Sequence, residues 1–259
     1  QENYSKFLEY NVKDAVLVEE LEDKLGLIEL VQAMSYNAKC NYNDTFGMVK
    51  YWETIIYNFL KEQKIATPPQ RLNYTQKTHS IIGAYVKEPQ VGGHDWVVSF
   101  DLNSLYPHLI MQYNISPEKM VKGDKQDVSI KKILNEEVDL SHLKKHTVTP
   151  NGVLFKRDKQ GFLPELMEKF YDERRLWKKK MIDYQIEYQT ADAEKRTKLD
   201  VLIKRAYNNQ QVRKIALNSA YGALANQYFA FFSIDLAEAI TTSGQLVIQW
   251  AEKTINKYL

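Results

Sequence analysis

The sequence predicts a helix-rich α+β fold with a few antiparallel strands and one long antiparallel pair of helices. Two long helical patterns, at residues 164–188 and 194–223, are separated only by a short break, and helices joined so closely form an antiparallel hairpin. Short β-branched runs at residues 81–86 and 96–100, and a turn signal between residues 147 and 155, supply the strands.

The N-terminal region is expected to hold two helices. Residues 5–38 carry leucine, isoleucine and valine at helical spacing, and residues 43–45, Asn-Asp-Thr, can cap a second helix. The apolar stripe of that second helix is typical of a core-facing helix rather than of a ligand site; it consists of Val49, Trp52, Ile56 and Phe59. Residues 67–69, Thr-Pro-Pro, break the chain, and a linker is expected to run to about residue 80.

The middle of the chain alternates strands, turns and one helix. The runs 81–86 and 96–100 are predicted to be strands joined through Gly92 and Gly93, the second of them buried. A helix is expected at residues 105–114, whereas the polar stretch 119–145 predicts little. Residues 150–152, Pro-Asn-Gly, indicate the turn of a second hairpin, and residues 234–258 a last helix.

Composition limits the class of protein only loosely. Over 259 residues the net charge is +2, with 44% hydrophobic and 26% charged residues, which is ordinary for a globular chain and does not by itself indicate nucleic acid. Cys40 is the single cysteine, so an internal disulfide is excluded. Because no apolar run reaches the length of a membrane-spanning helix, no membrane partner is expected.

One helix face combines a cation, an amide and an aromatic ring. At about 100° per residue, Lys214, Asn218 and Tyr221 fall within about 60° of one another. A solvated helix face is the alternative interpretation for a lone Lys-Asn pair. A similar choice applies to Arg174 and Lys178, which are four residues apart and could bind a triphosphate or line a solvated helix.

A carboxylate follows the predicted buried strand 96–100. Asp101 lies where the chain must turn, and a carboxylate at that edge is suited to a hard cation such as Mg²⁺. The alternative is a turn or helix-cap aspartate, with Asn103 and Ser104 as neighbouring caps.

Together these motifs resemble motifs A and B of family B DNA polymerases, in the form found in T-even-type bacteriophages. The similarity lies in residues 99–107 and 213–224, and it extends to residues 114–118 and 239–245. Because several motifs follow one another in the same order and spacing, the resemblance is specific and runs along nearly the whole chain.

The resemblance implies a role for each candidate residue. Asp101 and the Leu102 carbonyl would bind metal, and Lys214 would act in catalysis as well as in phosphate binding. Tyr106 would lie under the sugar and exclude a 2′-hydroxyl. The residues implied to bind nucleotide are Ser104, Leu105, Tyr106, Arg174, Lys178, Lys214 and Asn218, and those implied to contact DNA are Tyr221 and Gly222.

Near the N-terminus, Tyr10 and Asp14 match the third motif of the family's 3′–5′ proofreading exonuclease. Four residues apart on a helix, they could orient water and hold a metal ion. Taken alone, the spacing fits a surface pair equally well, so this interpretation depends on the resemblance downstream.

The same resemblance predicts how the chain is divided. Residues 1–80 would be an exonuclease tail and linker helices, 81–163 the first part of a polymerase palm, 164–224 the fingers and 225–259 a palm helix. The second catalytic carboxylate of the family, its thumb and the earlier exonuclease carboxylates are absent. We therefore expect a central segment, divided artificially or by a natural split gene, that is inactive alone.

The expected reaction is template-directed transfer of a nucleotide from a dNTP to a primer 3′-hydroxyl with two Mg²⁺ ions. The expected partners are primer–template DNA, dNTP and a second chain or missing part carrying the other carboxylate and the thumb. The expected location is the cytoplasm of a phage-infected bacterium. The competing function is a non-catalytic nucleic-acid-binding or scaffold subunit of a replication complex.

Overall fold

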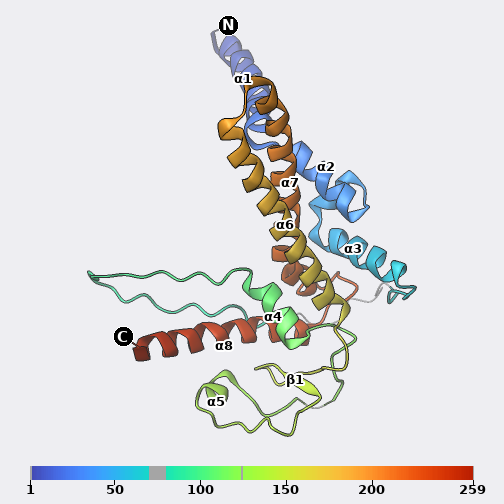
Figure 1. Ribbon diagram of the computed structural model, residues 1–259, viewed down its shortest axis with the longest axis vertical. Coiled ribbons are helices and arrows are strands. Elements are labelled where there is room, and N and C mark those ends of the chain that lie inside the picture. Colours follow the sequence, from blue (N-terminus) through green and yellow to red (C-terminus); the bar gives the residue numbers. More distant parts are fainter. Residues whose placement is uncertain (1, 70–79, 124, 259) are drawn as a thin grey trace.

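A computed structural model describes residues 2–69, 80–123 and 125–258 (Figure 1). The molecule is mainly helical, with one small antiparallel sheet. Within the described ranges, no helix is both long and apolar enough to cross a membrane. In chain order the elements are α1 Glu2–Leu25, α2 Leu27–Ala38, the 3₁₀ helix η1 Tyr42–Phe46, α3 Met48–Glu62, α4 Leu105–Tyr113, α5 Ile130–Leu134, β1 His146–Val148, β2 Leu154–Lys156, α6 Phe162–Thr190, α7 Ala193–Leu224 and α8 Ile234–Tyr258.

The helix predicted for residues 5–38 is two helices, α1 and α2, because Gly26 interrupts it. Gly26 adopts a left-handed conformation with φ 61°, which glycine tolerates without steric cost. The Glu22 carboxylate then accepts hydrogen bonds from the N–H groups of Leu27 and Ile28, at 3.0 Å each, and so caps the start of α2. The prediction of helix is confirmed on both sides of Gly26, but the prediction of one continuous helix is wrong.

α3 is a core helix, as its apolar stripe predicts. Trp52 and Ile56 are each 1% exposed, and Val49 and Phe59 pack against the same core at its edge. The Trp52 indole also donates a hydrogen bond to Ser219 Oγ on α7 at 3.0 Å. α3 and α2 therefore form a layer against one side of α7.

The strands predicted at residues 81–86 and 96–100 are absent, and this prediction was wrong. Residues 80–100 are irregular and leave the body as a long excursion beside α8 (Figure 1). Val97, Val98 and Phe100 are 79%, 71% and 70% exposed, so the second run is not buried either. A strand needs a neighbouring strand to hydrogen-bond its backbone, and no described strand lies beside this segment.

Side chains of α8 take the place of a partner strand for a few backbone groups. Thr241 Oγ1 donates to the Ile82 carbonyl at 2.7 Å, and Gln245 Nε2 donates to the Gly83 carbonyl at 2.6 Å. Lys87 forms an ion pair with Glu252 farther along α8. These contacts hold the first arm of the segment against the helix without making a sheet.

The second predicted hairpin is confirmed. β1 and β2 pair antiparallel with Thr147 opposite Phe155, and Phe155 is fully buried. Gly152 in the turn has φ 85°, and a Cβ there would stand 2.5 Å from the Gln126 carbonyl oxygen. The turn therefore requires glycine both for its backbone conformation and for the close approach of the preceding loop.

α6 and α7 are joined by two residues and pack side by side along their length (Figure 1). At the lower end of the pair, Leu166 and Met167 of α6 and Leu217 of α7 are at most 2% exposed. Higher up, Arg213 Nε donates to Glu173 Oε2 at 2.9 Å across the interface. The start of α7 is capped by Asp192, whose carboxylate accepts from Lys195 N–H at 2.9 Å.

Candidate functional site

The start of α4 forms a sharp turn at one side of the candidate site. Ser104 has a left-handed backbone, φ 52° and ψ 49°, which is uncommon for a residue with a side chain. Pro107 sits in the first turn, where a missing N–H costs nothing. The N–H groups of Ser104 and Leu105 donate to no described residue. The turn thus presents two free backbone donors and the positive end of a helix, a combination that favours an anion.

α6 contacts this turn directly. Arg174 Nη1 lies 3.4 Å from Ser104 Oγ, a long hydrogen bond. Tyr171, one turn earlier on α6, has its ring 4.7 Å from that of His108, and its hydroxyl accepts from Asn103 Nδ2 at 3.3 Å. The structure therefore brings together two predicted nucleotide-binding residues, Ser104 and Arg174, from segments 70 residues apart.

The ring of Tyr106 lies close to residues of both α7 and α8. The rings of Tyr106 and Tyr221 meet edge to face with centroids 5.2 Å apart. Gly244 of α8 also lies close to the ring, since a Cβ there would stand 3.0 Å from Tyr106 Cε1. Burial raises the pKa of both tyrosines, with the neighbouring Tyr106 adding to the shift of Tyr221, so both hydroxyls stay protonated at neutral pH.

The remaining predicted polar residues of the helical pair are exposed. Lys178, Lys214 and Asn218 point into solvent, and neither lysine forms an ion pair with a described residue. Arg213, next to Lys214, behaves differently, because its side chain is 11% exposed and paired with Glu173. Gly222 is exposed too, with nothing within 4 Å of where a Cβ would stand. Of these two adjacent cations, Arg213 therefore stabilises the helical pair, whereas Lys214 is free to bind a ligand.

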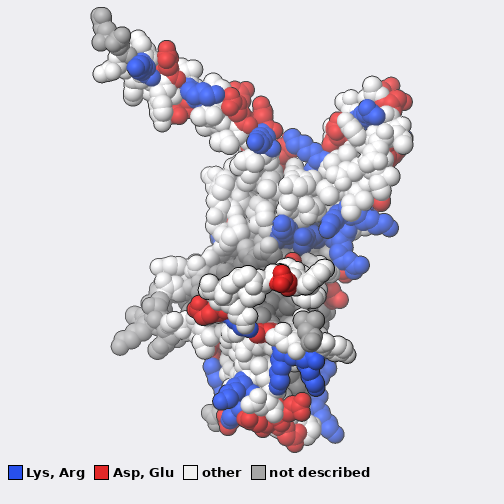
Figure 2. Space-filling model, turned by 90° about the vertical axis from the view of Figure 1, so that its left-hand side faces the viewer, with Lys and Arg blue, Asp and Glu red and all other residues white. Residues whose placement is uncertain are grey.

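Charge is unevenly distributed although the net charge is small. Figure 2 shows a group of Lys and Arg side chains at mid-height on the left-hand face of the molecule, whereas basic and acidic side chains are interspersed above and below it. Such a local concentration attracts polyanions more strongly than a net charge of +2 suggests.

The predicted metal ligands are not assembled. Asp101 is exposed and forms no hydrogen bond or ion pair with a described residue, and Leu102 is 46% exposed. Asp14 and the 66%-exposed Tyr10 lie on α1, whose residues are almost all exposed. Among the described residues, no group of three or more His, Cys, Asp or Glu could hold a metal ion. The described residues therefore do not by themselves complete a Mg²⁺ site.

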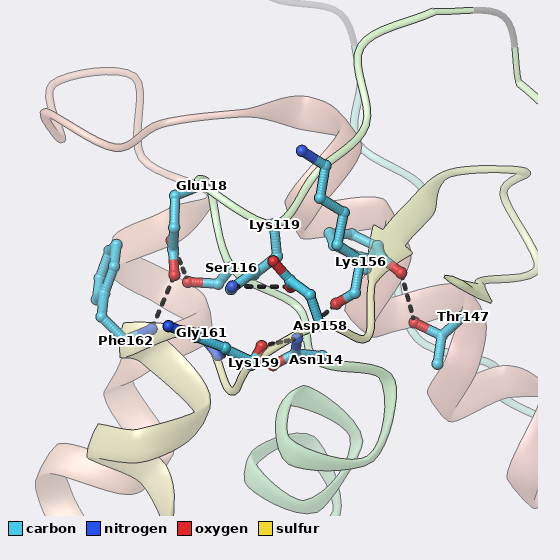
Figure 3. A network of polar contacts seen from close by, with 11 residues as sticks. Asn114, Ser116, Glu118, Lys119, Thr147, Lys156, Asp158, Lys159, Gly161 and Phe162 are labelled. Carbon is cyan, nitrogen blue, oxygen red and sulfur yellow. Dashed lines mark hydrogen bonds and ion pairs between the residues drawn. The ribbon is translucent and has the colours of Figure 1, made fainter. Parts of the chain in front are cut away.

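Residues 114–118 have a structural role that the sequence did not reveal (Figure 3). They cap the first turn of α6, where Gly161 has no side chain to do so. Asn114 Oδ1 accepts from Gly161 N–H at 2.8 Å, Glu118 Oε1 from Phe162 N–H at 2.9 Å and Ser116 Oγ from Leu163 N–H at 3.3 Å. The fourth position is Pro164, which has no N–H, so every donor at this helix start has an acceptor.

The same three side chains also fix the chain that leads into α6. Asn114 Nδ2 donates to the carbonyls of Lys156 and Lys159, at 2.7 and 3.0 Å. Ser116 Oγ donates to Glu118 Oε2 at 2.6 Å, and a Cβ at Gly161 would stand 2.5 Å from the Ser116 Cβ. In the sequence, the only indication was Gly161, which has no side chain to cap the helix that begins after it. A glycine at this position does not reveal which residues accept hydrogen bonds from the first N–H groups of the helix.

Comparisons with known proteins place this chain in one family. The family description for DNA polymerase family B matches residues 47–259. The chain is 32% identical to the DNA-directed DNA polymerase of Enterobacteria phage T4, over 99% of this chain and 32% of the relative. It is 30% identical to the DNA-directed DNA polymerase of Escherichia phage RB69, over 100% of this chain and 32% of the relative.

A solved structure agrees in fold. The family B DNA polymerase of the archaeon Pyrobaculum calidifontis matches with a TM-score of 0.62 and 18% identity, over 92% of this chain and 28% of that chain. At that identity the match shows similarity of fold alone. The chain spans 32% of the length of either phage relative. With motifs, family match and fold in agreement, the chain belongs to DNA polymerase family B.

Proposed function

We propose that this chain is the central segment of a template-directed DNA polymerase, which transfers a nucleotidyl group from a dNTP to a primer 3′-hydroxyl. The observation that carries the proposal is the meeting of α4 with α6 and α7. There, the free N–H groups of Ser104 and Leu105 lie beside Arg174, and Tyr106 packs on Tyr221. The turn would bind a triphosphate, since both its helix dipole and its cation favour an anion.

We assign the parts of the chain accordingly. Residues 1–80 would belong to an exonuclease tail with linker helices, 81–163 and 225–259 to the palm, and 164–224 to the fingers. Lys178 and Lys214, exposed and without an ion pair to a described residue, would join Arg174 on the phosphates. Asn218 would face the nascent base pair, and the open surface at Gly222 would admit DNA.

Tyr106 is the residue we propose for sugar selection. Its ring packs against Tyr221 and lies close to α8 at Gly244, so these contacts limit its movement. A rigid ring under the sugar would exclude a 2′-hydroxyl by its bulk.

We also propose that the polymerase uses Mg²⁺ and that this chain supplies only one of the metal-binding carboxylates, Asp101. Metal ions at such a site neutralise the charge that develops during phosphoryl transfer. Because the described residues hold no cluster of metal-binding side chains, further carboxylates would come from a second chain or another part of the protein. Asp14 would belong to a separate exonuclease site. The cytoplasm of a phage-infected bacterium remains the proposed location.

A primer-extension assay tests whether this chain needs carboxylates from another chain or another part of the protein. The 259-residue chain with primer–template, dNTP and Mg²⁺ should give no extension and no 3′ degradation. Extension should appear when a chain carrying the missing carboxylate and thumb is added, and Asp101→Asn should abolish it. Extension by this chain alone that depends on Asp101 would overturn the incomplete-site proposal.

A non-catalytic nucleic-acid-binding or scaffold subunit is the alternative, and Trp177 fluorescence separates the two. Trp177 lies on α6 between Arg174 and Lys178, and Lys180 Nζ stands 4.6 Å from its ring centre. A polymerase segment should show saturable quenching by dNTP, weakened about tenfold in Lys178→Gln or Lys214→Gln by loss of a charged contact. Lys198→Gln, near the start of α7, is the matched control. A scaffold should respond to DNA in a salt-dependent way but not to dNTP.

A further inference from the structure

A second cavity lies away from the candidate nucleotide site. It measures about 250 Å³, is partly open to solvent and lies where α2 and α3 meet α6 and α7. None of the residues proposed above to contact nucleotide, DNA or metal lines it. Its apolar wall is formed by Ile55, Phe59, Leu166 and Phe170. A space of this size suits a one- or two-ring molecule rather than a full nucleotide triphosphate.

Tyr51 brings an unsatisfied hydroxyl to the cavity wall. Its side chain is 1% exposed, and its hydroxyl forms no hydrogen bond with any residue in the described part of the chain. Burial, the main cause, raises the pKa of Tyr51, so the hydroxyl stays protonated and can donate. Because Tyr51 lines the cavity and its hydroxyl has no partner among the described residues, the hydroxyl is available to donate to an acceptor on a ligand.

The lining of the cavity contains one more positively charged side chain than negatively charged ones. Lys39 is paired with Glu62 at 3.0 Å, and Arg213 with Glu173 at 2.9 Å. Lys169, the third cation of the lining, forms no ion pair with a described residue. The lining therefore combines apolar rings, one free hydroxyl donor and one unmatched positive charge.

We propose that this cavity binds a small planar aromatic molecule that carries a single negative charge. Its ring would lie among the apolar side chains, its acceptor atoms would take the hydrogen bond that Tyr51 lacks, and its charge would balance Lys169. This site does not depend on the polymerase assignment, because no residue of that assignment takes part in it.

Calorimetric titration of the chain with 2-naphthoate tests the proposal. A ligand of this size in a formed pocket should bind with a dissociation constant of about 0.1 to 1 mM. Tyr51→Phe keeps the ring and removes the donor, so affinity should fall about fivefold to tenfold. Lys169→Gln should lower it about threefold, because that lysine is exposed. Lys179→Gln, on α6 but outside the cavity, should change nothing, and neutral 2-naphthamide should bind more weakly.

Two outcomes would overturn the proposal: no saturable binding, or binding that Tyr51→Phe leaves unchanged, since the ligand would then sit on exposed apolar surface elsewhere. If Tyr51→Phe loses helical circular dichroism, the wild-type chain can be tested by nuclear Overhauser effects between naphthoate and the Phe59 and Phe170 rings. Their presence would support the site, and their absence would refute it.

Discussion

The α6–α7 pair and the segment from residue 80 to 103 differ in where their backbone groups find partners. The two helices satisfy their own N–H and C=O groups, and the first donors of α6 are capped by Asn114, Ser116 and Glu118. The segment obtains a few hydrogen bonds from α8 side chains, and its apolar residues, such as Val98, face solvent. Order in the first region is local, whereas in the second it depends on a neighbour.

Hydrogen exchange should show the largest difference between the two regions. Amides near Met167 and Leu217 open only with the core, so they should exchange more than about 10³-fold more slowly than amides at residues 84–100. Mass spectrometry of peptides from both regions measures this directly. Equal protection would mean that the segment has a stable partner that the structure does not contain.

Truncation of one side chain in each region should separate their contributions to stability. Met167 is fully buried, so Met167→Ala should lower the free energy of unfolding by about 2 to 5 kcal/mol. Val98 is 71% exposed, so Val98→Ala should change it by less than about 0.5 kcal/mol. Urea titrations followed by circular dichroism compare the two. A large loss for Val98→Ala would contradict the exposed placement of the segment.

The cap on α6 provides the next test, because the first turn of this helix is stabilised by residues 114–118, which are distant in the sequence. Glu118→Ala leaves the Phe162 N–H without its acceptor and should cost about 1 kcal/mol. Glu165→Ala is the control, since that exposed carboxylate lies in the same first turn without capping it. Equal losses in the two variants would show that helix-dipole charge, not the cap, matters.

The ion pair between α6 and α7 should contribute about as much as the cap, and an exposed ion pair should contribute less. Glu173→Gln weakens the contact with Arg213, whose side chain is 11% exposed, and should cost about 1 kcal/mol after allowance for partial solvation. Glu194→Gln removes an exposed pair with Lys198 on α7 and should cost less than about 0.5 kcal/mol. If both changes have the same effect, the pair does not help to hold the helices together.

The sequence predicted the elements whose hydrogen bonds are local. Helical spacing located α3, α6, α7 and α8, and Pro150-Asn151-Gly152 located the β1–β2 hairpin. Prediction from the sequence failed where the local structure depends on a distant part of the chain or on a single residue. Residues 81–86 and 96–100 have strand propensity but no described strand to pair with, and Gly26 divides a helix that spacing alone would continue.

In the candidate site, too, the sequence predicted the arrangement of residues within one helix but not the contacts between helices. The shared face of Lys214, Asn218 and Tyr221 follows from rotation along one helix. The contacts of Ser104 with Arg174 and of Tyr106 with Tyr221 join different helices, so only a resemblance could suggest them. The resemblance also suggested metal ligands. Among the described residues, however, the suggested carboxylates are isolated and form no cluster. The roles of all these residues stay predictions.

Gly244 has a consequence for how this protein can evolve. A single methyl group there would press on the ring of Tyr106, at 3.0 Å from Cε1. The ring also packs against Tyr221, which limits how far it can yield. Positions 106 and 244 should therefore vary as a pair among descendants of this chain, with a larger residue at 244 arising only after the ring at 106 has become smaller.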